Sequence, residues 1–280
     1  MSDPLISTGE LAARFGEPGL RIIDASWYLP GVARDPDAEF LERHIPGAVQ
    51  FSLETVSDHS NPLPHMLASP EAFAEAVGAI GVGNADMVVV YAADGLVPAA
   101  RVWWNFRVMG HDRVRVLDGG LPKWLAEGRP VQSGLATPTL ASFTSNYRPE
   151  LVRDVEDVRQ ALASGEAQVI DVRAAERFRG DAPEPRAGLR AGHMPGATNL
   201  PHSTLVAADT TMLSEPGLAQ RFADADIVPE RPIIASCGSG VSACVAALAL
   251  ARMGRWDTAV YDGSWSEWGS RADTPLTTGA

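Results

Sequence analysis

An internal repeat constrains the fold of this chain more than any other feature. The pentapeptide His44-Ile45-Pro46-Gly47-Ala48 recurs as His193-Met194-Pro195-Gly196-Ala197. Each copy follows an apolar run that ends in aspartate, and each precedes an aspartate–glycine pair and a tryptophan. These landmarks are Asp24, Asp118 and Trp124 in the first copy and Asp171, Asp262 and Trp268 in the second. Because the landmarks recur in the same order, the sequence predicts two homologous domains.

The repeat also indicates where the domains begin and end. We assign residues 1–132 to an N-terminal domain, residues 133–150 to a linker rich in Ser, Thr, Gly and Pro, and residues 151–280 to a C-terminal domain. The chain length of 280 residues fits this division, because single domains commonly have about 100–200 residues.

Strand-like and helix-like segments alternate in both halves of the chain. Residues 87–91 are strongly apolar and rich in β-branched side chains, as expected of a strand that is buried on both faces, and residues 114–117 are also expected to form a strand. Residues 70–80 and 99–109 are expected to be helices. Parallel strands are joined by helical crossovers that cover both faces of the sheet. The expected fold class is therefore α/β, with a mainly parallel sheet flanked by helices in each domain.

Charge and composition argue against several classes of function. The formal net charge of −12 disfavours nucleic acid and an anionic membrane surface as partners. No apolar run approaches the roughly 20 residues of a membrane-spanning helix, and the first residues lack the pattern of a secretory signal. Two cysteines, Cys237 and Cys244, favour a reducing cytoplasm as the compartment. We therefore expect a cytoplasmic protein whose anionic substrates are attracted by a local site.

Cys237 is the candidate nucleophile. It ends the apolar run 233–236, and Gly238 and Gly240 follow it before an Ala/Leu-rich stretch at 241–253 that is expected to be helical. A strand, a glycine-rich loop and a helix start form an anion site, because backbone N–H groups and the positive end of the helix dipole converge there. The same groups favour thiolate over thiol. A buried structural cysteine at a strand end is one alternative. A phosphate-binding loop is the second, but the lysine and the glycine spacing of a P-loop are missing.

The loop Cys237-Gly238-Ser239-Gly240-Val241-Ser242 resembles the active-site loop of the rhodanese-like sulfurtransferases. It is most similar to the Cys-Gly-Ser-Gly-Val-Thr form of the 3-mercaptopyruvate sulfurtransferases within that family. Ser242 stands where threonine is usual and keeps the hydroxyl group. Thiosulfate sulfurtransferases usually carry basic residues directly after the cysteine, whereas Gly238 and Ser239 are uncharged. Together with the repeat, the resemblance covers essentially the whole chain and implies two tandem rhodanese-like domains.

The resemblance implies roles for residues around Cys237. A persulfide on Cys237 would be stabilised by the loop, and the residues expected to bind it and the substrate are Gly238, Gly240, Val241 and Ser242. Arg177 and Arg186 match the pair that binds the carboxylate and keto oxygens of mercaptopyruvate, and Arg173 and Arg179 are lesser candidates. Loop arginines are otherwise commonly solvated or paired, here with Glu176 or Glu184.

The resemblance further implies a serine–histidine–acid relay that moves protons at the substrate. Ser239 matches its serine, His65 its histidine and Glu54 its acid. His65 would then extend from the N-terminal domain, which places the expected site in an interdomain cleft. A surface carboxylate is the alternative for Glu54. In the N-terminal domain the repeat aligns residues 91–95 with residues 236–240, and no cysteine occurs there, so this domain is expected to lack the chemistry.

Not every recurring residue is expected to be catalytic. His44 and His193 occur in both copies, whereas the nucleophile occurs in one, so both histidines are interpreted as structural turn residues satisfied by the backbone. Cys244 is interpreted as a core residue. No set of cysteines and histidines has zinc-like spacing and no dinucleotide fingerprint occurs, so no metal or cofactor is expected.

The resulting expectation is a sulfurtransferase that moves sulfur from 3-mercaptopyruvate through a Cys237 persulfide to a thiol or cyanide and releases pyruvate. The acceptor would be thioredoxin or a low-molecular-weight thiol. Two alternatives stay open: a thiosulfate sulfurtransferase and a non-enzymatic rhodanese-like binding or sulfur-carrier module. A cysteine-dependent phosphatase is disfavoured, because that chemistry uses an arginine six residues after the cysteine and position 243 is alanine.

Overall fold

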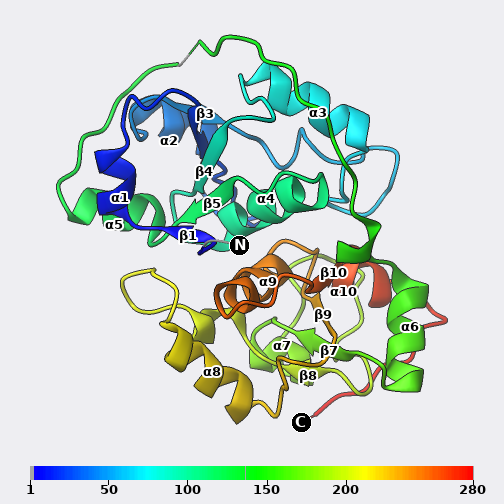
Figure 1. The fold of residues 1–280 in the computed structure, drawn as a ribbon. Helices are drawn as coiled ribbons and strands as arrows, with labels where there is room; N and C mark the ends of the chain where they lie inside the picture. Colours follow the sequence, from blue (N-terminus) through cyan, green and yellow to red (C-terminus); the bar gives the residue numbers. More distant parts are fainter. Residues whose placement is uncertain (1–2, 136, 280) are drawn as a thin grey trace. The chain divides into compact units, whose positions relative to one another are not determined.

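Two parallel β-sheets with the same strand order form the framework of the chain. A computed structural model describes residues 3–135 and 137–279 (Figure 1). The sheets have the orders β1-β5-β4-β2-β3 and β6-β10-β9-β7-β8, and every strand pair within them is parallel. With helices flanking each sheet, the structure confirms the expected α/β fold and the duplication predicted from the repeat.

The chain divides into two compact units. The first comprises Met1–Asp58, Leu67–Arg148 and Ala207–Met212, and the second comprises His59–Met66, Pro149–Val206 and Leu213–Ala280. Each unit therefore includes a short segment that the linear division at residues 132 and 151 assigns to the other. The segment that contains His65 packs with the second unit, and this bears directly on the candidate site.

The first unit contains five strands and five helices among the described residues. The strands are β1 (Leu5–Ile6), β2 (Leu20–Asp24), β3 (Ala48–Gln50), β4 (Met87–Tyr91) and β5 (Val114–Leu117). The helices are α1 (Thr8–Ala13), α2 (Pro36–Glu42), α3 (Pro70–Ala79), α4 (Val97–Val108) and α5 (Gly120–Ala126). In the central strand β4, residues Val88 to Tyr91 are fully buried, as expected of a strand covered on both faces.

The second unit repeats this arrangement. Its strands are β6 (Val152–Arg153), β7 (Gln168–Asp171), β8 (Thr198–Asn199), β9 (Ile233–Ser236) and β10 (Ala259–Tyr261). Its helices are α6 (Val155–Ser164), α7 (Ala175–Arg179), α8 (Glu215–Asp224), α9 (Ala243–Arg252) and α10 (Ser264–Trp268), with the 3₁₀ helices η1 (Pro149–Leu151) and η2 (His202–Leu205). The Ala/Leu-rich helix α9 is buried from Ala243 to Ala251, which explains why its sequence has no polar face.

The short edge strands are the part of the fold that the sequence did not predict. Strands β1, β6 and β8 have two residues each, too few to show a period-2 pattern, and they form by pairing with β5, β10 and β7 respectively. Arg177 and Arg179, treated as loop residues from the sequence, lie in helix α7. Gly180 ends this helix in the left-handed conformation with φ 82°.

The recurring histidines have the structural role that was expected of them. His44 Nδ1 donates to Phe40 O over 2.7 Å, and His193 Nδ1 donates to Phe178 O over 2.8 Å. Each imidazole stacks on the phenylalanine that supplies the carbonyl, with ring centroids 4.1 and 3.6 Å apart. Both histidines are buried, so they fix the turn before β3 in the first unit and the turn before β8 in the second.

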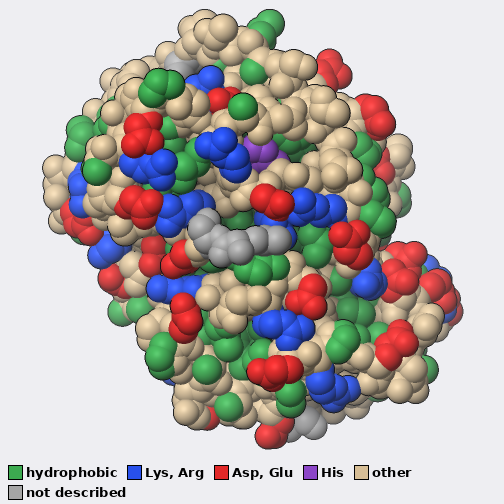
Figure 2. Space-filling view, viewed as in Figure 1, with side chains coloured by type: hydrophobic (Ala, Val, Ile, Leu, Met, Phe, Trp, Pro, Cys, Tyr) green, Lys and Arg blue, Asp and Glu red, His purple; other side chains and the backbone are tan. Residues whose placement is uncertain are grey.

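Charged side chains of both signs are interspersed on the face shown in Figure 2, and neither sign forms a continuous patch there. Within residues 3–135 and 137–279, no helix combines the length and apolarity needed to cross a bilayer.

Candidate active site

Cys237 lies at the carboxyl edge of the second sheet, directly after strand β9. Strand β7 pairs with β9 in parallel, with Asp171 opposite Ser236, and the next residue, Val172, donates its N–H to Ser236 O over 2.9 Å. The loops after β7 and β9 therefore leave the sheet side by side. This edge is where α/β sheets bind ligands. Cys237 is 1% exposed and is a free cysteine.

Helix α10 fixes the loop after Cys237 from one side. Cys237 N–H donates to Ser264 Oγ over 3.1 Å, and Cys237 O accepts from Trp265 N–H over 3.0 Å. Gly238 O accepts from both the N–H and the hydroxyl of Ser266, over 2.8 and 2.7 Å. Because the loop carbonyls are used on this side, the following N–H groups are directed elsewhere.

The next amides of the loop form a cradle for an anion. Among the described residues, nothing accepts a hydrogen bond from the N–H of Gly238, Ser239, Val241 or Ser242. Gly240 has φ 74°, a left-handed conformation that glycine adopts without strain and that lets the loop turn before α9 begins at Ala243. Uncommitted N–H groups at a helix N-terminus stabilise a thiolate or persulfide anion.

Arg177 brings a positive charge to this cradle. A methyl group placed on Gly238 would lie 3.1 Å from Arg177 Nη2, so the guanidinium rests against the loop directly after Cys237. The same Nη2 donates to Glu184 Oε2 over 2.5 Å, and the arginine side chain keeps 22% of its surface exposed while Glu184 is 2% exposed. A buried carboxylate thus orients Arg177, and part of its guanidinium remains available to a ligand.

Arg173, a lesser candidate for substrate binding from the sequence, has a structural role instead. Its side chain is fully buried and donates to Asp171 over 2.6 Å and to Glu184 over 2.7 Å. Its Nη2 also donates to Gly192 O over 2.8 Å, and the guanidinium lies over the Trp265 ring. With these contacts made and its side chain fully buried, Arg173 has no exposed surface that a substrate could contact.

The other two arginines of this region lie farther along the chain. Arg179 donates to Asp181 over 2.7 Å and is partly exposed, as expected of an ion pair at the surface. Arg186 is half-buried in the irregular segment after α7.

His65 and Ser239 lie close together in the second unit. His65 Nδ1 is 3.4 Å from Ser239 Oγ, and both residues are about 5% exposed. His65 has φ 59°, a left-handed conformation that is uncommon for a residue other than glycine. Such strain is kept only where the surroundings hold it, and here it directs the imidazole at the loop after Cys237.

Glu54, the expected acid of the relay, belongs to the first unit. Its Oε1 accepts a hydrogen bond from Trp27 Nε1 over 2.7 Å, and the residue is exposed. This carboxylate is therefore oriented by an indole N–H.

His202 is a candidate that the sequence reasoning missed. Its N–H donates to Val172 O over 3.0 Å, which places it at the carboxyl edge of the sheet, on the side of β7 away from β9. Burial and the positive charge of Arg177 lower the pKa of the His202 imidazole. The repeat contained a signal for it, because the corresponding residue of the first copy is the buried Leu53.

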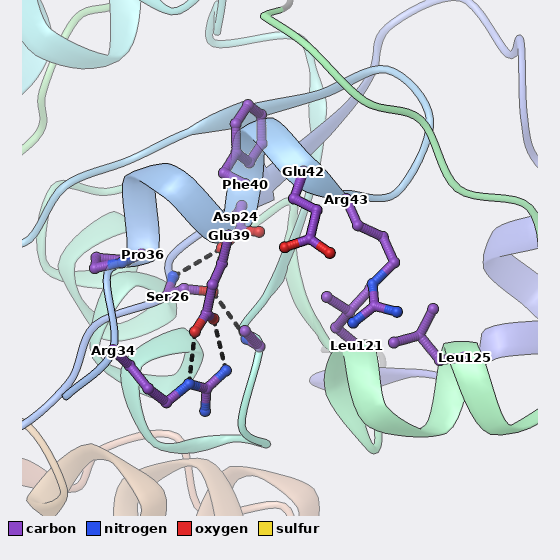
Figure 3. A pocket seen from close by; sticks show the side chains of 11 residues that line it. Asp24, Ser26, Arg34, Pro36, Glu39, Phe40, Glu42, Arg43, Leu121 and Leu125 are labelled. Carbon is purple, nitrogen blue, oxygen red and sulfur yellow. Dashed lines mark hydrogen bonds and ion pairs between the residues drawn. The ribbon is translucent and has the colours of Figure 1, made fainter. Parts of the chain in front are cut away.

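The first unit has the same framework without a nucleophile. Ala92 follows β4 as Cys237 follows β9, and its carbonyl accepts from Leu121 N–H as the carbonyl of Cys237 accepts from Trp265. A cavity of about 210 Å³ lies beside this loop (Figure 3). Its Arg34 is held by two hydrogen bonds to Glu39, and no thiol lines it.

Among the described residues, no group of three or more His, Cys, Asp or Glu side chains is arranged to hold a metal ion.

Known proteins are similar to this chain in sequence and in fold. The family model "Rhodanese-like domain" matches residues 7–127 and 154–271. The human 3-mercaptopyruvate sulfurtransferase is 44% identical, with 93% of this chain and 88% of the human protein covered. The mitochondrial thiosulfate/3-mercaptopyruvate sulfurtransferase 1 of Arabidopsis thaliana is 42% identical, with 98% of this chain and 78% of that protein covered.

A solved structure agrees with the sequence matches. The crystal structure of the 3-mercaptopyruvate sulfotransferase SseA from Escherichia coli has a TM-score of 0.87 and 38% identity, with 94% of this chain and 99% of that chain covered. Both halves of the chain match the same domain model, and the relatives are matched over most of their length. The chain therefore belongs to the rhodanese family, as a tandem of two rhodanese-like domains.

Proposed function

We propose that this chain is a sulfurtransferase that takes sulfur from 3-mercaptopyruvate onto Cys237 and passes it to a thiol or to cyanide. The observation that carries the proposal is the loop at the carboxyl edge of the sheet, where uncommitted N–H groups follow the buried Cys237 and the guanidinium of Arg177 lies against Gly238. Two relatives with this substrate in their names, matched over most of the chain, support the choice of donor.

The first half of the reaction makes a persulfide. The Cys237 thiolate attacks the sulfur of mercaptopyruvate, an S–S bond forms, and the C–S bond breaks with its electron pair going to carbon. The carbon fragment leaves as the enolate of pyruvate. The proton that the donor thiol carried ends on the methyl group of pyruvate, and the anionic outer sulfur stays on Cys237. Amide N–H groups that meet this negative charge act as oxyanion-hole donors do.

The second half regenerates the enzyme. A thiolate or cyanide attacks the outer sulfur, the S–S bond breaks, and the Cys237 thiolate leaves with its electron pair. The product is a persulfide of the acceptor or thiocyanate. No metal or organic cofactor takes part in either half.

We assign the remaining roles as follows. Gly238, Gly240, Val241 and Ser242 hold the persulfide and the developing charge. Arg177 and Arg186 bind the carboxylate and keto oxygens of the donor, since a guanidinium fork suits a carboxylate. Ser239, His65 and Glu54 form the proton relay. The short distance from His65 to Ser239 supports the first link of that relay.

Thiosulfate is the second candidate donor. The Arabidopsis relative carries both donors in its name, so overall similarity does not separate them. The side chains after the cysteine favour mercaptopyruvate, because Gly238 and Ser239 bring no positive charge to a dianionic donor. A binding module without catalysis is disfavoured by the intact cysteine loop.

We expect the acceptor to be a thiol protein such as thioredoxin or a low-molecular-weight thiol, and the working compartment to be the cytoplasm. Neither cysteine forms a disulfide, which fits a reducing environment. A net charge of −12 makes nucleic acid an unsuitable partner.

Sulfur transfer to cyanide or a dithiol, with mercaptopyruvate and thiosulfate as parallel donors, tests the proposal. The variant Cys237→Ser is the blank, and Cys244→Ser is the matched control, because Cys244 lies buried within α9 and donates to Gly240 O. We expect activity with mercaptopyruvate that is lost in the first variant and kept in the second. A preference for thiosulfate would favour the second donor, and no transfer from either would favour the binding module.

A further inference from the structure

His202 lies at the same sheet edge as the nucleophile. Parallel strands are about 4.8 Å apart, and the strand order β9-β7-β8 puts one strand between those that lead to Cys237 and to His202. Val172 bridges the two sides, because its N–H donates to Ser236 O and its carbonyl accepts from His202 N–H. Two strand spacings put the backbones at these two positions about 10 Å apart. Val172 lies between them and leads into α7, the helix that carries Arg177.

The imidazole of His202 is not used by the fold. Among the described residues, no group hydrogen-bonds to either of its ring nitrogens, although the residue is half-buried. The structural histidines contrast with it, because His44 and His193 each donate to a backbone carbonyl. A half-buried imidazole beside a substrate-binding arginine thus has a donor and an acceptor to offer a ligand.

We propose that His202 is part of the subsite for the carboxylate end of the anionic sulfur donor, where it donates a hydrogen bond and takes up a proton when the donor is bound. The inference rests on the proposed function and adds a residue to its binding site. On this proposal, the His202 side chain is neutral in the free enzyme and positively charged in the complex with the donor.

The electrostatics of the free site explain the proton uptake. Burial, followed by the charge of Arg177, lowers the pKa of His202, so the imidazole is neutral at neutral pH. A carboxylate bound to Arg177 offsets that charge and attracts the imidazolium, which raises the pKa of His202 in the complex. By linkage, the ligand then binds more tightly below the pKa of the complex than above it.

Other groups surround His202, and Arg177 is the charged group that acts on its pKa. Helices α8 and α9 pack against η2. Their titratable or charged residues are Glu215, Arg221, Asp224, Cys244 and Arg252. On the β7 side, Asp171 and Arg173 neutralise each other, and Glu184 is shared by Arg173 and Arg177.

Pyruvate is the probe for this subsite, because it has the carboxylate and keto group of the donor and no thiol. We would titrate it into Cys237→Ser protein by calorimetry from about pH 8 to about pH 5, where an unperturbed imidazole titrates. A pKa of His202 that is higher by one in the complex corresponds to a dissociation constant about tenfold lower at the acid end. Measuring the binding enthalpy in two buffers that differ in ionisation enthalpy would give the number of protons taken up on binding.

Two substitutions of His202 separate hydrogen bonding from charge. His202→Gln keeps a donor without titration, so we expect the wild-type affinity near pH 8 and no tightening at lower pH. His202→Phe keeps the ring without a donor, so we expect affinity about 5- to 10-fold weaker near pH 8, as for a lost hydrogen bond, and again no tightening. His65→Gln, which alters the other histidine at the site, should keep the tightening.

The inference is overturned if either His202 variant keeps the acid tightening, or if pyruvate binds the parent protein equally at all pH values. It is also overturned if pyruvate does not bind while the Cys237 enzyme still transfers sulfur from mercaptopyruvate. That last result leaves the proposed function standing, whereas absence of transfer by the unmodified enzyme would refute the proposed function itself. Thermal unfolding of each variant checks that it folds.

Discussion

Arg173 and Arg177 both bind Glu184, and the structure predicts opposite consequences of losing each. Arg173 is fully buried and neutralises the buried carboxylates of Asp171 and Glu184. Arg173→Gln would leave negative charge in the core with no cation beside Asp171. Removing one partner of a buried ion pair typically costs about 3–5 kcal/mol. In a chain of this size that loss lowers the melting temperature by roughly 6–20 °C.

Arg177→Gln should leave the fold nearly intact. Glu184 would keep its bond to Arg173, so no buried carboxylate loses its last cation. A partly exposed pair of this kind contributes at most about 1 kcal/mol, which corresponds to a few degrees. The substitution should instead weaken the binding of the sulfur donor. A charge-assisted hydrogen bond to the donor carboxylate is worth about 1.5–3 kcal/mol, so kcat/KM for mercaptopyruvate should fall roughly 10- to 150-fold.

Differential scanning fluorimetry and steady-state kinetics on the two variants test the division of roles. Arg177→Lys is an informative third variant, because it keeps the charge and loses the planar fork. The reasoning is refuted if Arg173→Gln melts like the parent protein. It is equally refuted if Arg177→Gln lowers the melting temperature as much as Arg173→Gln, or leaves kcat/KM unchanged.

Three further predictions follow from single positions. Gly240→Ala and Gly254→Ala both force a side chain into a left-handed conformation, with φ 74° and 85°, at a cost of about 1–2 kcal/mol. Only Gly240→Ala should also lower kcat, by tenfold or more, because it displaces the N–H groups beside Cys237. Equal losses of kcat in the two variants would contradict the role given to these N–H groups. His193→Ala removes the bond to Phe178 O and the stacked ring, so urea unfolding should show a loss of about 1–3 kcal/mol, whereas an unchanged midpoint would count against the structural role. Burial raises the pKa of Asp24, so folding takes up a proton on this carboxyl group. The stability that this protonation contributes is fully present below the pKa of the unfolded state and is lost as the pH rises through the pKa of the folded state. Asp24→Asn should therefore raise the melting temperature more at pH 8 than at pH 4, and a pH-independent difference would argue against it.

The amino-acid sequence alone was sufficient to predict the duplicated α/β fold and to single out Cys237 as the candidate nucleophile. Local patterns suffice for both: the repeated turn around His44 and His193 marks equivalent points of two sheets, and the apolar run before Cys237 with the glycines after it specifies a strand, a loop and a helix start. The structural role of the two histidines could also be inferred, because a residue present in both copies cannot account for chemistry that only one copy retains.

Only the tertiary structure distinguished Arg173 from Arg177 and brought His202 to the site. Both arginines lie in one charged segment, and their roles differ because β7 buries the first with Asp171 while α7 turns the second toward Gly238. His202 follows a two-residue strand with no pattern in the sequence, and its neighbours come from β7 and α7. The packing of His59–Met66 into the second unit was hidden for the same reason. Which groups meet at a sheet edge depends on strand order, and strand order is set by packing between segments far apart in the chain.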